Sequence, residues 1–101
     1  MTDQPDNKPK MLPVVTGLHV VGTPTTTSFV VGYSASKGAQ HYNTRVIVPS
    51  GKMTVGPNCP GLTCTVSDLV PATAFVVTVV AHAPGGVYSP PSVPLTVRTA
   101  A

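Results

Sequence analysis

Apolar and polar residues alternate with a period of two over several short stretches of the chain, a pattern typical of β-strands with one buried face. Residues 74–82 show it most clearly, because every second side chain there can face a core. These inner residues are Phe75, Val77, Val79 and Ala81. Over residues 41–49 the same rule gives an inner set of Tyr42, Thr44, Val46 and Val48. No window repeats apolar residues at helical spacing, so the pattern predicts an all-β chain.

Seven short strands are predicted, separated by turns rich in proline and glycine. They lie near residues 14–22, 27–35, 41–49, 52–56, 63–67, 74–82 and 93–99. Regular strand spacing of this kind favours an antiparallel β-sandwich. A chain of 101 residues holds one such domain, which we place at residues 13–101. Residues 1–12 are polar and carry prolines, so an extended N-terminal arm is predicted there.

Four segments resemble the fibronectin type III family. They are the run Leu69–Ala81, which places leucine, proline and threonine at alternate positions before a strand, the opening Val15–Val20, the stretch Ser28–Tyr33 and the close Ser89–Val93. The resemblance covers residues 13–100 and implies a seven-stranded, immunoglobulin-like sandwich that acts as a scaffold or binding module. The chain departs from the family twice. Tyr33 stands where the family places a core tryptophan, and Phe75 stands where it places a corner tyrosine, whose hydroxyl would donate a hydrogen bond.

Charge is sparse, with 9% charged residues and a formal net charge of +3. The excess comes from residues 13–101, where Lys37, Arg45, Lys52 and Arg98 face the single acid Asp68. Nucleic-acid-binding surfaces gather their basic residues on one face, whereas these four lie on four different segments. No apolar run approaches the ~20 residues that span a bilayer, and the polar first eleven residues are unlike a secretory signal peptide. Neither a nucleic acid nor a membrane is therefore expected as a partner.

Cys59 and Cys64 are the sharpest local feature of the sequence. A disulfide between them would close a small loop and stabilise the fold by roughly 2 kcal/mol. The alternative is a pair of reduced thiols, with Cys64 buried as a small apolar side chain. The spacing differs from that of a redox enzyme, which usually has two intervening residues, and two sulfurs alone do not make a zinc site.

The inventory of chemical groups argues against an enzyme. Glycoside hydrolysis usually needs two carboxylates, and the predicted domain has only Asp68. A Ser-His-Asp arrangement needs three converging groups, yet His41 and His82 belong at the opposite pole from Asp68. We expect no catalytic residue, no metal and no cofactor.

His41 and His82 are predicted to face outward as neighbours on adjacent strands. They would then be close enough to bind a metal weakly or to repel each other when protonated, although two independent solvated side chains are the simpler interpretation. His19 belongs to the other sheet and cannot join them.

Two protein-binding surfaces are predicted. The first is the turn after residue 82, which carries Val87 and Tyr88 on a flexible tip, and aromatic side chains are favoured interface anchors. The second is the outer face of the two central strands, where Ile47, Val76 and Val80 would form an apolar patch. The other four aromatic side chains fall on inner positions, so only one ring remains, which makes a poor platform for sugars.

Together these observations predict a non-enzymatic structural or protein-interaction module. The setting we favour is a virion surface. There the chain would decorate a phage head or tail and dock on capsid or tail subunits through its arm and one sheet face, with weak contacts to host surfaces or glycans. The alternative is an extracellular one, in which the chain is a spacer module of a secreted carbohydrate-active enzyme or adhesion protein and contacts the neighbouring domains.

Overall fold

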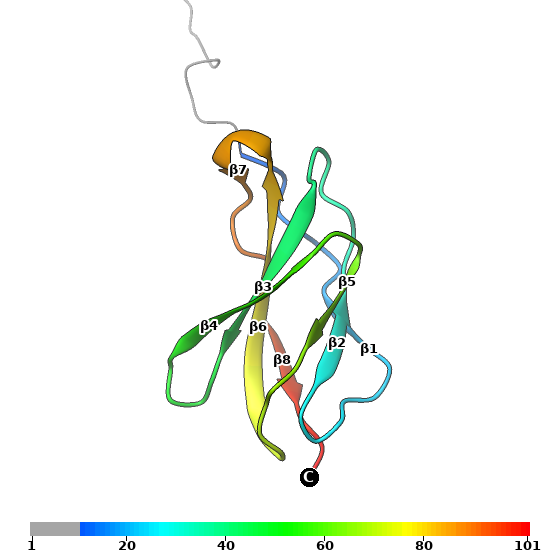
Figure 1. The fold of residues 1–101 in the computed structure, drawn as a ribbon, viewed down its shortest axis with the longest axis vertical. Helices are drawn as coiled ribbons and strands as arrows, with labels where there is room; N and C mark the ends of the chain where they lie inside the picture. Colours follow the sequence, from blue (N-terminus) through cyan, green and yellow to red (C-terminus); the bar gives the residue numbers. More distant parts are fainter. Residues whose placement is uncertain (1–10) are drawn as a thin grey trace, which may run out of the picture.

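Two antiparallel sheets packed face to face form the fold (Figure 1). The computed structural model describes residues 11–101, with the side chain of Pro57 excepted. One sheet has three strands in the order β1-β2-β5. They are β1 (His19–Val21), β2 (Phe29–Gly32) and β5 (Thr63–Val66). The predicted β-sandwich is confirmed.

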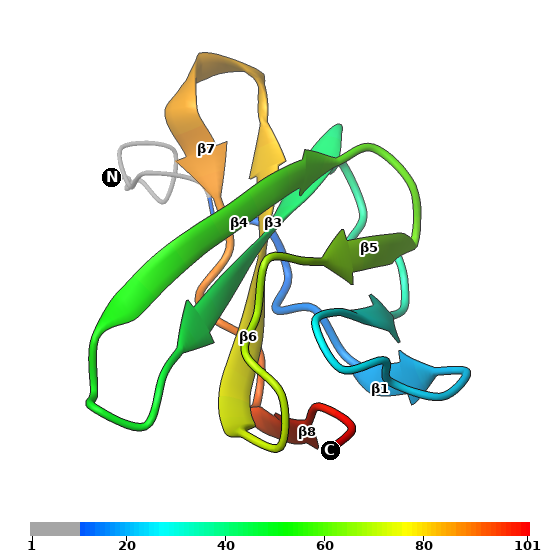
Figure 2. The ribbon, with the colours of Figure 1, turned by 60° about the horizontal axis from the view of Figure 1, so that its bottom comes forward.

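The second sheet has five strands, with β6 at its centre (Figure 2). Its strands are β3 (His41–Ile47), β4 (Met53–Cys59), β6 (Ala74–Ala83), β7 (Val87–Tyr88) and β8 (Leu95–Arg98). β3 pairs with β4 and β6, and the far side of β6 pairs with β7 at one end and with β8 at the other. Within residues 11–101, the helical structure is a 3-10 turn at Pro84–Gly86.

Most strands are a few residues shorter than predicted, and three differences bear on the fold. β1 is shorter than residues 14–22, because its ladder with β2 begins at the pair His19 and Gly32. Before it, the Ser34 N–H donates to the Thr16 carbonyl at 2.8 Å outside the ladder. β4 continues through Pro57 to Cys59, where a turn was predicted. β7 was not predicted, because its two residues are too few to show a periodic pattern.

The arm predicted over residues 1–12 lies mostly outside the described residues. Met11 and Leu12 are described, and Leu12 belongs to the folded part. Its side chain packs against the core, and its N–H donates to the Tyr88 carbonyl at 3.3 Å. The chain therefore joins the sandwich one residue earlier than predicted.

The core lies between the sheets and contains four of the five aromatic rings. Phe29 and Phe75 pack with centroids 6.4 Å apart, and Tyr33 and Tyr42 with centroids 4.8 Å apart. Tyr33 occupies the position where the family places its core tryptophan. Burial, and secondly the neighbouring Tyr42, raise the pKa of the Tyr33 phenol to about 12. The hydroxyl stays protonated and donates to the Gly61 carbonyl at 3.0 Å.

The corner before β6 is held by a residue that the sequence pattern did not single out. Phe75 has no hydroxyl to donate there, as predicted. Thr99, after β8, bonds to the same corner instead. Its Oγ1 donates to the Val70 carbonyl at 2.6 Å and accepts from the Thr73 N–H at 3.0 Å. The corner therefore keeps a hydroxyl tether although the tyrosine is missing.

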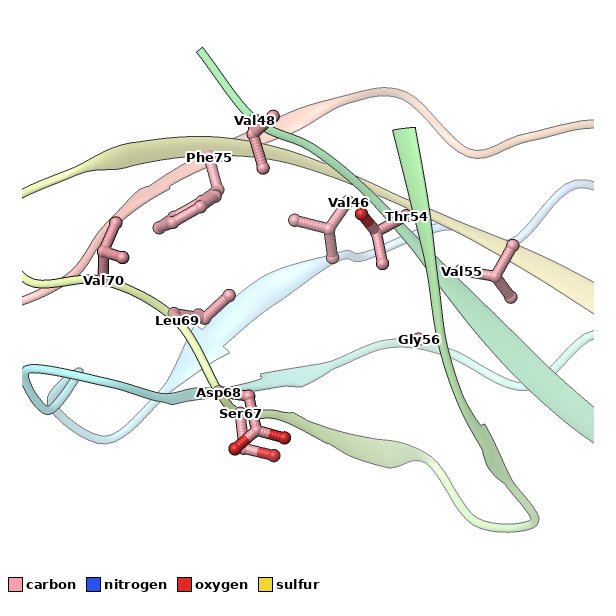
Figure 3. A pocket seen from close by; sticks show the side chains of 10 residues that line it. All are labelled: Val46, Val48, Thr54, Val55, Gly56, Ser67, Asp68, Leu69, Val70 and Phe75. Atoms are coloured by element: carbon pink, nitrogen blue, oxygen red, sulfur yellow. The ribbon is translucent and has the colours of Figure 1, made fainter. Parts of the chain in front are cut away.

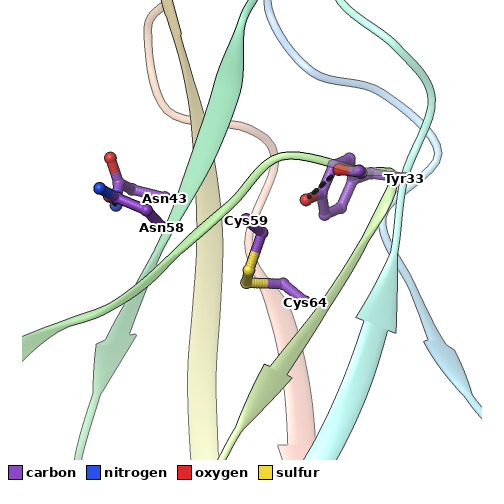
Figure 4. The surroundings of a disulfide bond; sticks show 6 residues. Tyr33, Asn43, Asn58, Cys59 and Cys64 are labelled. Carbon is purple, nitrogen blue, oxygen red and sulfur yellow. Dashed lines mark hydrogen bonds between the residues drawn. A yellow bond between two sulfur atoms is a disulfide. The ribbon is translucent and has the colours of Figure 1, made fainter.

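The two cysteines form a disulfide, with Cα atoms 5.6 Å apart (Figure 4). Cys59 is the last residue of β4 and Cys64 is the second residue of β5, so the bond joins the two sheets. Of the two alternatives that the sequence allowed, a disulfide and a pair of reduced thiols, the structure has the disulfide.

Candidate interaction surface

A row of three ring side chains crosses one end of the five-stranded sheet. His41 of β3 pairs in register with His82 of β6, which pairs in turn with Tyr88 of β7. The two imidazoles are stacked, with centroids 5.0 Å apart and planes at 2°. The Tyr88 ring lies 6.2 Å from His82. The predicted cross-strand neighbourhood of the two histidines is confirmed.

This row faces away from the core. The next residues along β3 and β6, Tyr42 and Ala81, are buried between the sheets, and successive side chains of a strand point to opposite faces. His19 lies on β1 of the other sheet, as predicted, and its Nδ1 is 2.6 Å from the Gly17 carbonyl oxygen. We call the solvent-facing side of β4, β3, β6 and β7 the outer sheet face.

Tyr88 lies on a strand rather than on the flexible tip that was predicted. Gly85 and Gly86 adopt φ values of 80° and 78°, which side chains other than glycine rarely tolerate. They reverse the chain tightly, so that Val87 pairs back onto Ala83 and Tyr88 onto His82. The strand holds the phenol ring 51% exposed, whereas Val87 is half-buried.

Electrostatics at this end favour uncharged histidine. Burial lowers the pKa of His82 below its usual value of 6.5, and the neighbouring positive charges of His41 and Arg45 lower it further. Both histidines are partly exposed. At neutral pH the His82 imidazole is therefore uncharged and presents one nitrogen with an available lone pair.

The opposite end of the outer sheet face is apolar. Ile47 and Val76 pair directly across β3 and β6, and both are half-buried. Met53 of β4 pairs with Ile47 and is 54% exposed, and Val55 lies on the same strand at 64% exposed. Ile47 and Val76 were predicted to lie here, whereas the two β4 residues were not, since β4 has no continuous apolar alternation.

Val80 was predicted to join this patch, and that prediction is wrong, because Val80 is only 1% exposed. Both sides of β6 are occupied at this point. Asn43 of β3 pairs with Val80 on one side, and Ser89 and Ser92 hydrogen-bond to the backbone of β6 on the other. Val80 therefore lies outside the exposed apolar patch.

The middle of the outer sheet face is polar. The Asn43 amide donates to the Asn58 side-chain oxygen across β3 and β4. Arg45 lies one outward position further along β3, paired with Val55 and Thr78. A cation between an aromatic end and an apolar end matches the composition of protein interfaces, which are enriched in tyrosine, methionine and arginine.

A cleft of about 500 Å³ opens between the sheets beside β4 (Figure 3). Val46, Leu69, Val70 and Phe75 are among its mainly apolar lining residues, and Asp68 lies at its margin with φ +61°. No periodic pattern of residues indicated this cleft, because the irregular segment 67–70 forms one wall. Within residues 11–101, no three His, Cys, Asp or Glu side chains gather as a metal-binding group. No helix in this described part is long and apolar enough to cross a membrane.

No protein-family model matches the sequence, and no curated protein matches it. Solved structures do. The domain FN3tt is 21% identical, with a TM-score of 0.76 over 90% of this chain and 97% of that one. The FN3 domain of the human collagen alpha-1(XX) chain is 20% identical, with a TM-score of 0.73 over 97% and 94%. The chicken CNTN1 FN1–FN3 domains are 18% identical, with a TM-score of 0.76 over 91% of this chain and 32% of that one.

These similarities show that the chain has the fibronectin type III fold, which confirms the resemblance found in the sequence. The chain spans about the whole length of FN3tt and about a third of the CNTN1 chain.

Proposed function

We propose that this chain is a non-catalytic module that binds another protein through its outer sheet face. The observation that carries the proposal is the row of His41, His82 and Tyr88 on three paired strands, in which the Tyr88 ring is 51% exposed. An aromatic ring fixed in this way loses little conformational freedom on binding, and tyrosine is enriched among the residues that dominate binding energy. Domains with the fibronectin type III fold commonly sit within multidomain proteins and mediate protein contacts.

The charge on the domain suggests the kind of partner. Among residues 11–101, the lysines and arginines outnumber the single acidic side chain, Asp68, by four to one. Arg45 lies in the middle of the outer sheet face. We therefore expect a partner with a neutral or acidic surface, and an association rate that falls as salt is added.

The size of the face suggests a weak contact. Its strands β4, β3, β6 and β7 contain 7, 7, 10 and 2 residues. With strands ~4.8 Å apart and ~3.4 Å per residue, they cover roughly 400 Å². A stable interface takes about 800 Å² from each partner. The overall affinity of a face of this size increases most when many linked copies bind together.

Such multivalent display is consistent with the virion setting, in which the chain decorates a phage head or tail. That setting is part of our proposal and rests on the sequence, with residues 1–12 as the second point of attachment. The other setting, a spacer module in a secreted multidomain protein, is supported by neighbours that are parts of longer chains. In that case the outer sheet face would contact an adjacent domain.

The first test is the native mass of the material in which the chain occurs, measured by mass photometry. A mass in the megadalton range supports the virion setting. A mass that matches one longer polypeptide supports the spacer module.

The second test locates the contact. Tyr88→Glu and Met53→Glu place a charge at the two ends of the outer sheet face, and Val21→Glu places one on an exposed site of the other sheet. We expect the first two variants to be lost from the native assembly, whereas Val21→Glu is retained. Retention of all three variants would refute binding through this face.

A further inference from the structure

The histidine pair is arranged for a function other than protein contact. His41 and His82 lie directly opposite each other on adjacent antiparallel strands, on the face that solvent reaches. Side chains in such a pair have Cβ atoms about 4.5–5.5 Å apart, and the two rings lie with their centroids 5.0 Å apart. Two imidazoles at this separation can share one bound ion.

We propose that His41 and His82 together bind one divalent transition-metal ion. Cu²⁺ binds most tightly, and Ni²⁺ and Zn²⁺ bind more weakly. The rings are parallel in this structure. The χ2 angle of histidine has a broad distribution. A rotation about χ2 therefore turns one nitrogen of each ring toward a common point. Imidazole–metal distances of about 2.0–2.1 Å are then within reach.

The choice of metal follows from the ligands. Neutral imidazole suits Cu²⁺, Ni²⁺ and Zn²⁺, whereas Mg²⁺ and Ca²⁺ prefer oxygen. Affinity for nitrogen ligands peaks at Cu²⁺. Arg45, on the same strand, adds a positive charge that opposes any cation, so we expect the metal with the strongest bond to imidazole to bind best. Water completes the coordination in the isolated chain.

Other strong ligands in residues 11–101 are engaged or distant. Cys59 and Cys64 are joined to each other, so neither offers a thiolate. His19 lies on the other sheet and contacts the Gly17 carbonyl. It provides a matched control, because it is an exposed histidine on a strand with no histidine opposite it.

Calorimetric titration of the full, oxidised chain with Cu²⁺ and with Zn²⁺ tests the proposal. We expect one ion per chain. Loss of a group that only orients a ligand typically weakens metal binding about 10- to 100-fold, so His41→Asn and His82→Asn should each weaken it at least about tenfold. His19→Asn should bind as the wild type does. Thermal unfolding of each variant checks its fold, and Gln replaces Asn where the fold is lost.

A second measurement locates the ion. Substoichiometric Cu²⁺ should broaden the imidazole proton resonances of His41 and His82 and spare those of His19. Binding that persists unchanged in the His41→Asn/His82→Asn double variant would place the ion elsewhere and overturn the proposal. Equal weakening by His19→Asn, or no binding by the wild type, would also overturn it. Since all measurements use the isolated chain, they are independent of the proposed protein contact.

Discussion

Removing the disulfide should measurably weaken the fold. Cys59 and Cys64 are separated by five positions in the chain, so the bond closes a loop of about six residues. The chain-entropy relation gives about 2 kcal/mol for a loop of this length. For a domain of this size, 1 kcal/mol corresponds to roughly 4–8 °C in the unfolding midpoint. We therefore expect reduction to lower the midpoint by roughly 8–16 °C.

The assay is unfolding by heat, which gives the midpoint, and by urea, which gives the free energy, of the oxidised chain, the reduced chain and the Cys59→Ala/Cys64→Ala variant. The oxidised and reduced chains contain the same atoms apart from two hydrogens, so their difference isolates the cross-link. The difference between the reduced chain and the double variant reports lost packing, because Cys64 is buried. The double variant should not respond to reductant.

A difference between oxidised and reduced chains below about 0.5 kcal/mol would refute this reasoning. It would mean that residual structure already confines the loop in the unfolded chain or that the bond strains the folded one. The Tyr33 hydrogen bonds to the loop, from its hydroxyl to Gly61 and from its N–H to Leu62, are the contacts that would hold the loop in the reduced chain.

Urea unfolding also tests the contributions of Tyr33, Gly56 and His82 to stability. Tyr33→Phe removes the phenol hydrogen bond to the loop after β4 and should cost about 1 kcal/mol; no change would mean that water satisfies the carbonyl equally well. Gly56→Ala drives a Cβ into the buried Thr44 hydroxyl and should cost roughly 1–3 kcal/mol, partly recovered when Thr44→Ala is added. Because burial, and secondly His41, lower the pKa of His82, the folded state binds its proton less tightly than the unfolded state. The stability from this residue is present above about pH 6.5 and is lost as the pH falls below that value. The free energy of unfolding of His82→Gln should therefore fall less between about pH 8 and about pH 5 than that of the wild type. An equal fall would assign the pH dependence to other groups.

The sequence predicted the inner face of the central strands correctly and the exposure of the outer face only in part. Alternation placed Phe75, Val77 and Val79 inside, and all three are buried. The same rule placed Val80 on the outer side, yet it is covered. A period of two assigns a side chain to one face of a sheet, but neighbouring segments decide whether that face meets solvent.

The candidate site was also predicted only in part. The predicted bounds of the two central strands were enough to place His41 beside His82, because His41 begins one strand and His82 ends its antiparallel neighbour, and alternation turns both side chains outward. They were not enough to place Tyr88 in the same row. That required the reversal at Gly85 and Gly86, whose geometry decides whether the following residues form a strand.

The sequence by itself determined the all-β fold class and which residues of the central strands face the core. These follow from hydrophobic periodicity and turn chemistry, which act over a few neighbouring residues. The tertiary structure decided what depends on residues far apart in the chain. Thr99 replaces the missing tyrosine hydroxyl at the corner near Val70, and the disulfide joins two different sheets. The physical reason is that long-range contacts depend on how segments pack, and local patterns carry no record of that packing.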